Sequence, residues 1–260
     1  MKLKRYSAII ILVVIFLMIF PSSVPAQDKD LVYLLDRITD RISSYPENKN
    51  WKHTCITKDI TMNKQWQPKK TTITKSIETV IDGVPNGEIL EVLEIENGVT
   101  KDITQKKLKD IKDLEEKAKK NRAKEKPQNV YNDMINSLLP FAKDKREKYI
   151  FKKLDDSVIE STPVFLIEAK AIEKDENLYE GNYYIDKTTF DVLKIQIKPS
   201  KNPMFVDEME MEVSFLVLPE GGLVVKHSKI RGSAGILGMH IRHITEEDYS
   251  DFEILPATTH

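Results

Sequence analysis

The residues with metal-binding chemistry are two histidines near the C-terminal end of the sequence. His240 and His243 are three residues apart in a segment rich in Ile and Thr, which is typical of a β-strand. Residues three apart on a strand face opposite sides of the sheet, so the two imidazoles cannot share one ion. His227, on the preceding predicted strand, adds at most one further ligand. The sequence therefore predicts no metal site and no cofactor.

The residues with nucleophilic chemistry are as sparse. Cys55 is the only cysteine, and it is interpreted as a small buried strand residue, with a reactive thiol as the alternative. His53, two residues away, is the only nearby base. No serine lies in a Gly-X-Ser-X-Gly turn, and the glycines of 232–235 are predicted to form a hairpin turn rather than a phosphate-binding loop. We therefore expect no enzymatic activity.

Paired carboxylates occur in the segment 207–217, which alternates strictly between acidic and apolar residues. Glu208, Glu210 and Glu212 could bind calcium, but the alternation favours a solvated strand face. The opposite face is apolar and carries Met209, Met211, Val213 and Phe215. These four residues are the ones from which we predict a ligand-binding surface.

The elements that must position this strand are read from hydrophobic periodicity. A first helix is predicted from an apolar stripe that ends before Pro46, namely Leu31, Leu34, Leu35, Ile38, Ile42 and Tyr45. A charged helical excursion is predicted over 101–127 and a third helix over 129–142. Strand patterns occupy most of the remainder: 51–66, 71–81, 89–95, 149–154, 164–172, 181–186, 190–198, 206–218, 223–231 and 237–245.

The predicted strands follow one another through short turns, without helices long enough for parallel crossovers. The sequence therefore predicts an α+β fold with one antiparallel sheet of about ten strands. Such a sheet is about 48 Å wide, and a helix covers only about 10 Å of it. Incomplete coverage would leave an apolar cavity lined by the four β-strand residues and Met239, with Leu138 and Phe141 on a helical lid. The alternative is that the same residues fill an ordinary core.

The N-terminus has the pattern of an export signal. Lys2, Lys4 and Arg5 precede an apolar run over 8–20, and small residues at Val24 and Ala26 favour cleavage after residue 26. The alternative is an uncleaved membrane anchor. Residues 27–260 are predicted to form a single domain with a net charge near −4, which argues against nucleic-acid binding.

One stretch of sequence resembles a known family. The segment Gly181-Asn182-Tyr183-Tyr184-Ile185-Asp186-Lys187, followed by Val192-Leu193-Lys194-Ile195, is similar to a strand-turn-strand unit of the periplasmic lipoprotein-carrier superfamily, the outer-membrane lipoprotein-sorting proteins. The loop and strand over 155–172 and the order of elements also fit. The resemblance implies a strongly curved sheet, or half-open barrel, whose helices cover the concave face above a cavity for acyl chains.

The expected function is accordingly that of an exported, non-catalytic protein of the cell envelope. It would carry or sense acyl chains of lipids or lipoproteins in the periplasm or outside the cell, with at most transient membrane contact. The alternative is an interaction or regulatory sensor module of the same fold, with a filled core and an envelope protein as its partner.

Overall fold

The computed structural model describes residues 29–45, 50–81, 84–121, 130–218, 222–236 and 239–256 of the 260-residue chain. The predicted signal peptide, residues 1–26, lies outside the described residues. Two compact units are present, Met1–Asp36 and Arg37–His260, and helix α2 (Lys29–Ser43) includes residues of both. None of the described helices is long and apolar enough to cross a membrane.

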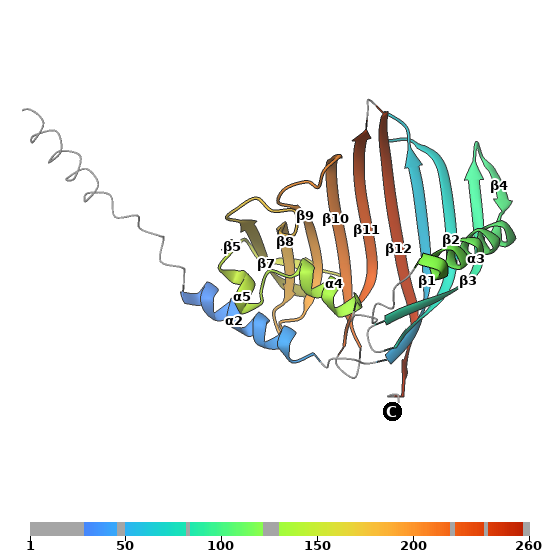
Figure 1. The fold of residues 1–260 in the computed structure, drawn as a ribbon. Coiled ribbons are helices and arrows are strands. Elements are labelled where there is room, and N and C mark those ends of the chain that lie inside the picture. Colours follow the sequence, from blue (N-terminus) through green and yellow to red (C-terminus); the bar gives the residue numbers. More distant parts are fainter. Residues whose placement is uncertain are drawn as a thin grey trace, which may run out of the picture. The chain divides into compact units, whose positions relative to one another are not determined.

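The second unit is built on one twelve-stranded antiparallel sheet (Figure 1), with the strand order β4-β3-β2-β1-β12-β11-β10-β9-β8-β7-β5, and β6 pairs with β7. The antiparallel β-rich fold predicted from the sequence is confirmed, with two more strands than the ten expected, because β4 and β6 are too short to show a pattern. The strands are β1 (Asn50–Met62), β2 (Pro68–Ile81), β3 (Val84–Glu96), β4 (Val99–Asp102), β5 (Tyr149–Lys153), β6 (Ser157–Ile159), β7 (Thr162–Ala171), β8 (Tyr179–Asp186), β9 (Val192–Pro199), β10 (Val206–Val217), β11 (Leu223–Ile236) and β12 (Met239–Leu255).

Strand β12 joins the N-terminal and C-terminal parts of the sheet. β12 pairs with β1 over almost its whole length, so among the described strands the N-terminal meander β1–β4 and the C-terminal run β5–β11 are joined by strand pairing only through β12. An apolar cluster of Trp51, Val80, Leu218 and Val224 is buried at one end of this joint, with Phe252 and Ile254 packed against it. The core of this region therefore depends on residues distant in the sequence.

The helices begin and end close to the predicted positions. In α2 the predicted stripe is confirmed, because Leu34, Leu35 and Ile38 are buried whereas Tyr33 is exposed. The charged excursion predicted over 101–127 begins later, since Asp102 ends β4 and its carboxylate accepts the backbone N–H of Thr104 at 2.8 Å. The helices that follow are α3 (Thr104–Asn121), α4 (Val130–Leu138) and α5 (Lys143–Arg146).

The predicted hairpin turn at 232–235 is wrong. Gly232 lies within β11, where it is paired with Met209 of β10 and His243 of β12. A Cβ at Gly232 would lie 3.2 Å from the carbonyl oxygen of Glu208. Glycine is thus found here because β10 approaches β11 closely, and not because the chain turns.

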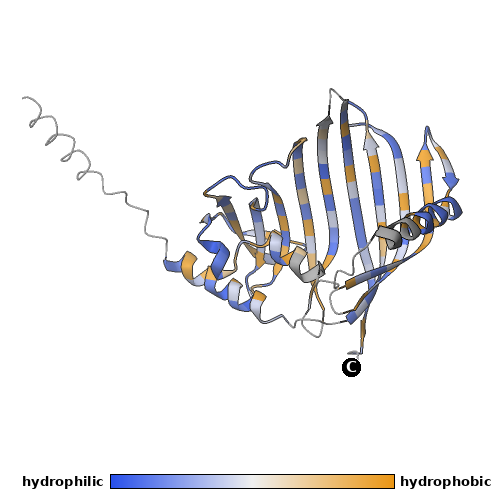
Figure 2. Ribbon diagram, viewed as in Figure 1, coloured by the Kyte–Doolittle hydropathy of each residue, from blue (hydrophilic) through white to orange (hydrophobic). Residues whose placement is uncertain are grey.

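Alternation on β10 is confirmed, since Met211, Val213 and Phe215 are buried and Glu208 and Glu210 are exposed. Hydrophobic and hydrophilic residues alternate along the central strands (Figure 2). The strand registers, however, show that the apolar face does not extend across the sheet. One row of paired residues is apolar from β7 to β10 and polar from β11 to β2: Ile167, Tyr183, Ile195, Val213, Ser228, Glu247, Thr57 and Thr74.

The polar part of this face is satisfied by its own hydrogen bonds. The hydroxyls of Ser228 and Tyr249 both donate to Glu247 Oε2 at 2.8 Å, and Thr245 Oγ1 donates to Asp59 Oδ1 at 3.0 Å. The expectation of one wide apolar face is therefore corrected. Threonine-rich strands favour sheet structure without making both faces apolar, and here Thr57 of β1 and Thr74 of β2 lie on the same face as Val213.

A buried carboxylate fixes the end of α2 to the sheet. Asp191 accepts hydrogen bonds from Arg41 Nε and Tyr45 Oη, each at 2.6 Å. Burial acts to raise the pKa of Asp191, but the hydrogen bonds from Arg41 and Tyr45 outweigh it, and the pKa is lowered. A carboxyl group with a lowered pKa stabilises the fold above its unfolded-state pKa, and this contribution disappears as the pH falls through the folded-state value.

We therefore expect Asp191→Asn to reduce the free energy of unfolding at neutral pH by about 2 kcal/mol. The difference from wild type should shrink as the pH falls below about 4, where Asp is protonated in the unfolded chain. Urea unfolding at several pH values measures both quantities. Asp155→Asn, on an exposed loop, is the control and should change little at any pH. A constant difference across the pH range would contradict the assigned ion pair.

Candidate binding site at a fork between two strands

Strands β9 and β10 are paired over only part of their length. Pairing runs from Ser214 opposite Lys194 to Met211 opposite Ile197 and stops there. Both strands continue, β9 to Pro199 and β10 back to Val206, without further pairing to each other. The two strands thus separate as a fork, and the segment Val206–Glu210 of β10 is hydrogen-bonded as a strand only to β11.

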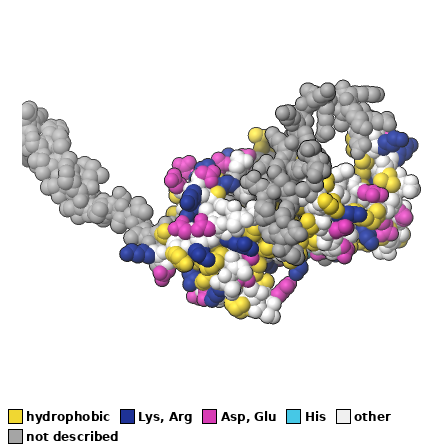
Figure 3. Space-filling view, turned by 90° about the horizontal axis from the view of Figure 1, so that it is seen from below, with side chains coloured by type: hydrophobic (Ala, Val, Ile, Leu, Met, Phe, Trp, Pro, Cys, Tyr) yellow, Lys and Arg dark blue, Asp and Glu magenta, His cyan; other side chains and the backbone are white. Residues whose placement is uncertain are grey.

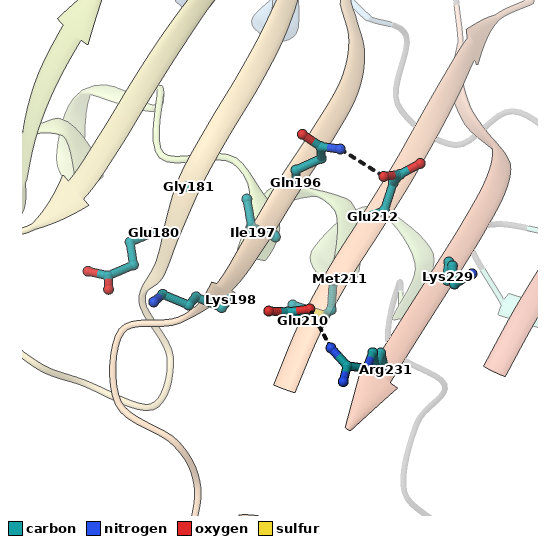
Figure 4. Close-up of a pocket in the computed structure, with 10 residues that line it drawn as sticks. All are labelled: Glu180, Gly181, Gln196, Ile197, Lys198, Glu210, Met211, Glu212, Lys229 and Arg231. Carbon is teal, nitrogen blue, oxygen red and sulfur yellow. Dashed lines mark hydrogen bonds and ion pairs between the residues drawn. The ribbon is translucent and has the colours of Figure 1, made fainter. Parts of the chain in front are cut away.

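A groove of about 560 Å³ lies at this fork (Figure 4). Most of its lining residues are charged or polar, and the two hydrophobic ones, Ile197 and Met211, are 3% and 8% exposed. These two side chains belong to the apolar face of the sheet and border the groove where the strands part. The lining residues are Glu180, Gly181, Gln196, Ile197, Lys198, Glu210, Met211, Glu212, Lys229 and Arg231.

Charges along the rim are mostly paired. Glu212 accepts hydrogen bonds from Lys194 Nζ at 2.7 Å and Gln196 Nε2 at 2.8 Å. Burial acts to raise the pKa of Glu212, but the bonds from Gln196 and Lys194 outweigh it and lower the pKa. Lys229 Nζ lies 2.7 Å from Glu246 Oε1.

Of two further cations that line the groove, only Lys198 is placed for an anionic ligand. The Arg231 guanidinium is 3.4 Å from Glu210 Oε2 and stacks 3.9 Å above the ring of Trp66. Lys198 is exposed and has no ion-pair partner within the described ranges. A negatively charged group in the groove could therefore bind Lys198 without displacing an existing ion pair.

Glycine is required at the edge of the groove. Gly181 of β8 has φ of +150°, and a Cβ there would lie 2.1 Å from the carbonyl oxygen of Gln196. β8 and β9 consequently approach each other more closely at the fork than a side chain would allow. The Gly181 position of the family-like segment is thus also a position of the groove.

The sequence-predicted ligand residues on β10 lie along one line that starts at the fork. Met211 lines the groove, and Val213 and Phe215 follow it along β10 on the same buried face. Met209 is half-buried and lies on the unpaired side of the fork. Met239 begins β12, and its side chain is not among those that the structure describes.

The predicted lid residues contact β5 and β8. Phe141 is fully buried, with its ring 5.2 Å from that of Tyr183 and 5.9 Å from that of Phe151. Its carbonyl oxygen accepts Thr39 Oγ1 at 2.6 Å, and the carbonyl oxygen of Leu138 accepts Tyr183 Oη at 3.2 Å. The segment after α4 is therefore anchored to the sheet. Phe141 fills the space above β8, and Tyr183 lies in the same row of paired residues as Val213.

The groove residues Gln196, Lys198, Lys229 and Arg231 were not predicted. The fork depends on where two strands stop pairing, which periodicity does not reveal. The signal in the sequence is proline: Pro199 ends β9 and Pro203 follows, and a residue without a backbone N–H cannot continue a ladder.

The chemically reactive residues of the sequence do not converge. His240 pairs with Asp207, His243 with Asp59 and His227 with Asp248, at 3.1, 3.1 and 2.8 Å. Cys55 is buried beside Thr57, and burial raises the pKa of its thiol to about 11. Among the described residues no three His, Cys, Asp or Glu side chains are grouped so that they could hold a metal ion.

Comparison with known proteins gives matches among solved structures alone, since no family model and no curated protein matches. The chain is similar to a putative outer membrane lipoprotein-sorting protein domain from Vibrio parahaemolyticus, at 14% identity and a TM-score of 0.38, over 86% of this chain and 93% of that one. The chain is similar in fold to lipoprotein-sorting proteins. This agrees with the resemblance seen in the sequence.

Two further matches cover similar shares of both chains. A LolA superfamily protein from Nitrosomonas europaea is 9% identical with a TM-score of 0.33, over 86% of this chain and 94% of that one. MucB is 8% identical with a TM-score of 0.29, over 86% of this chain and 94% of that one, and it has also been solved in complex with MucA.

Proposed function

We propose that this protein is an exported, non-catalytic binding protein that holds an acyl chain of a lipid or lipoprotein at the fork between β9 and β10. The observation that carries the proposal is the groove itself, whose charged and polar residues lie next to Ile197 and Met211, two residues of the apolar face of the sheet. An amphipathic ligand has the same two parts. Its polar group would bind Lys198 at the rim, and its acyl chain would enter past Met211.

Burial of the acyl chain supplies the free energy of binding. Each methylene transferred from water to an apolar surface contributes about 0.8 kcal/mol. Beyond Met211, the buried residues Val213 and Phe215 continue the apolar surface along β10. Methionine has three rotatable bonds and adapts to irregular guests, so Met211 and Met209 can move aside for an acyl chain.

The proposal includes the strongly curved sheet that the family resemblance implies. Helix α4 lies against β3, while the carbonyl oxygen of its last residue, Leu138, accepts a hydrogen bond from Tyr183 of β8. β3 and β8 are seven strand positions apart in the sheet, a distance of about 34 Å if the sheet were flat. A helix of nine residues is about 13 Å long, so contacts with both strands favour a sheet curved around α4.

Lipid content of the purified protein tests this proposal. Gentle purification followed by organic extraction and denaturing mass spectrometry should recover acyl lipid in a stoichiometric amount. Protein stripped of lipid should bind a fluorescent fatty acid with a dissociation constant in the micromolar range or below. A clean extract together with no uptake of the fatty acid at micromolar concentrations would end the carrier proposal.

A second candidate function is the binding of an envelope protein. The observation that favours it is the unpaired edge of β10 at Val206–Glu210, to which an extended peptide could add as a strand. If the protein binds an envelope protein in place of a lipid, uptake of the fluorescent fatty acid should be absent. Met209→Pro, which places a residue without an N–H at the free edge, should abolish capture of the partner while leaving the urea midpoint within the range of other surface variants.

A further inference from the structure

We propose that one end of the sheet is a contact surface for an anionic lipid bilayer. The turn-end surface consists of four apolar residues, Trp66, Met204, Phe205 and Ile241, and three cations, Lys64, Lys69 and Arg242. It lies at the top of β1, β10 and β12 in Figure 1, and its Trp66 contacts Arg231 at the edge of the groove. The inference is independent of the acyl-chain proposal.

Strand registers bring these residues together from distant parts of the sequence. Ile241 is paired with Ala234, which is paired with Val206, the residue after Phe205. Arg242, next to Ile241, is paired with Met62 at the end of β1, and its guanidinium is 5.9 Å from the ring centre of Trp66. The turn after β1 and the loop before β10 thus meet at one end of the sheet.

Three of the four apolar residues of this surface are turned to solvent, whereas Trp66 is half-buried beside Arg231 and Arg242. Met204 is 75% exposed, Phe205 58% and Ile241 63%, more than an apolar side chain without a partner favours. Phe205 also has φ of +69°, a left-handed conformation that is strained for a bulky residue. The bond from the backbone N–H of Gly235 to the carbonyl oxygen of Phe205, at 2.9 Å, holds this conformation. The fold therefore maintains an exposed aromatic residue at a cost in backbone strain.

Charge indicates which partner fits. Lys64, Lys69 and Arg242 have no ion-pair partner among the described residues, whereas the acids Asp207 and Glu208 at this end are paired with His240 and Arg231. Elsewhere the described surface mixes basic and acidic side chains, as the view from below shows (Figure 3). Protruding apolar side chains with Trp and unpaired cations are the combination that binds the interface of an anionic membrane.

Vesicle co-sedimentation of the purified protein tests this surface. We expect binding to phosphatidylcholine vesicles that contain phosphatidylglycerol, weaker binding at high salt, and little binding to phosphatidylcholine alone. Lys64→Gln, Lys69→Gln and Arg242→Gln should each weaken binding about fivefold, which corresponds to about 1 kcal/mol per cation near the surface. Phe205→Asn should weaken it about tenfold, and because Asn tolerates a left-handed backbone the variant should fold.

Matched variants away from this end serve as controls. Val158→Ser on β6 removes an equally exposed apolar side chain, and Lys152→Gln on β5 removes an equally exposed cation. Both should bind vesicles as wild type does, and so should Met211→Lys, which alters only the groove. Equal binding to both kinds of vesicle, or equal losses in Val158→Ser and Phe205→Asn, would overturn the inference.

Discussion

Met211→Lys is expected to weaken binding of a fluorescent fatty acid at least about 100-fold, a loss of about 2.7 kcal/mol. Met211 lines the groove and is the first of the buried residues along β10. An ammonium group at position 211 keeps water at the fork between β9 and β10. The methylene groups of an acyl chain that reach Val213 then lose their apolar surroundings. Circular dichroism should show that the chain still folds, because Met211 is the last paired residue of β10 before the fork, where a lysine can extend its charge to solvent.

The control for this variant is Met204→Lys. It makes the same chemical change at a side chain that is 75% exposed and outside the groove, so the fatty acid should bind as in wild type. Met211→Leu, which keeps an apolar side chain at this position, should retain most of the affinity for the fatty acid. If Met211→Lys bound the fatty acid as wild type does, the acyl chain would not pass the fork, and binding by strand addition would become the better explanation.

Phe141→Ala is expected to lower the free energy of unfolding by about 3–5 kcal/mol. Its ring is fully buried between Tyr183 and Phe151, so truncation leaves a cavity that the surrounding strands cannot close. The change should appear as a lower urea midpoint in equilibrium unfolding followed by circular dichroism.

Met134→Ala is the matched variant, because Met134 lies on α4 but is exposed, and it should cost less than about 1 kcal/mol. A loss as small as this in Phe141→Ala would mean that the segment following α4 is detached from the sheet in solution. Phe141 would then be a lid residue that moves, as the sequence pattern suggested, rather than the fixed core residue that its contacts indicate.

The sequence predicted best what depends on near neighbours. The alternation of 207–217 predicted both faces of β10, and the stripe from Leu31 to Ile38 predicted the buried side of α2, because periods of two and 3.6 are local properties of a strand and a helix. The turns between the first three strands likewise predicted that β1 pairs with β2 and β2 with β3, because a turn is also a local property of the sequence.

What the sequence did not predict depends on partners far along the chain. The pairing of β1 with β12 places Thr57 opposite Glu247, and nothing near Thr57 indicates that acidic neighbour. The polar part of the inward face was missed for this reason. The fork was missed because pairing ends through the shape of the loop between Pro199 and Pro203, which a strand pattern does not describe.

The position of β12 has a consequence for the order of assembly. Because β12 is synthesised after the other eleven described strands and is the one among them that pairs with both β1 and β11, the N-terminal meander and the rest of the sheet each keep an open edge until it arrives. Pairing across nearly the whole chain is slow, since the loop that it closes is long. Until β12 arrives, β1 and β11 therefore remain as two unpaired edges, and the twelve-stranded sheet cannot be completed.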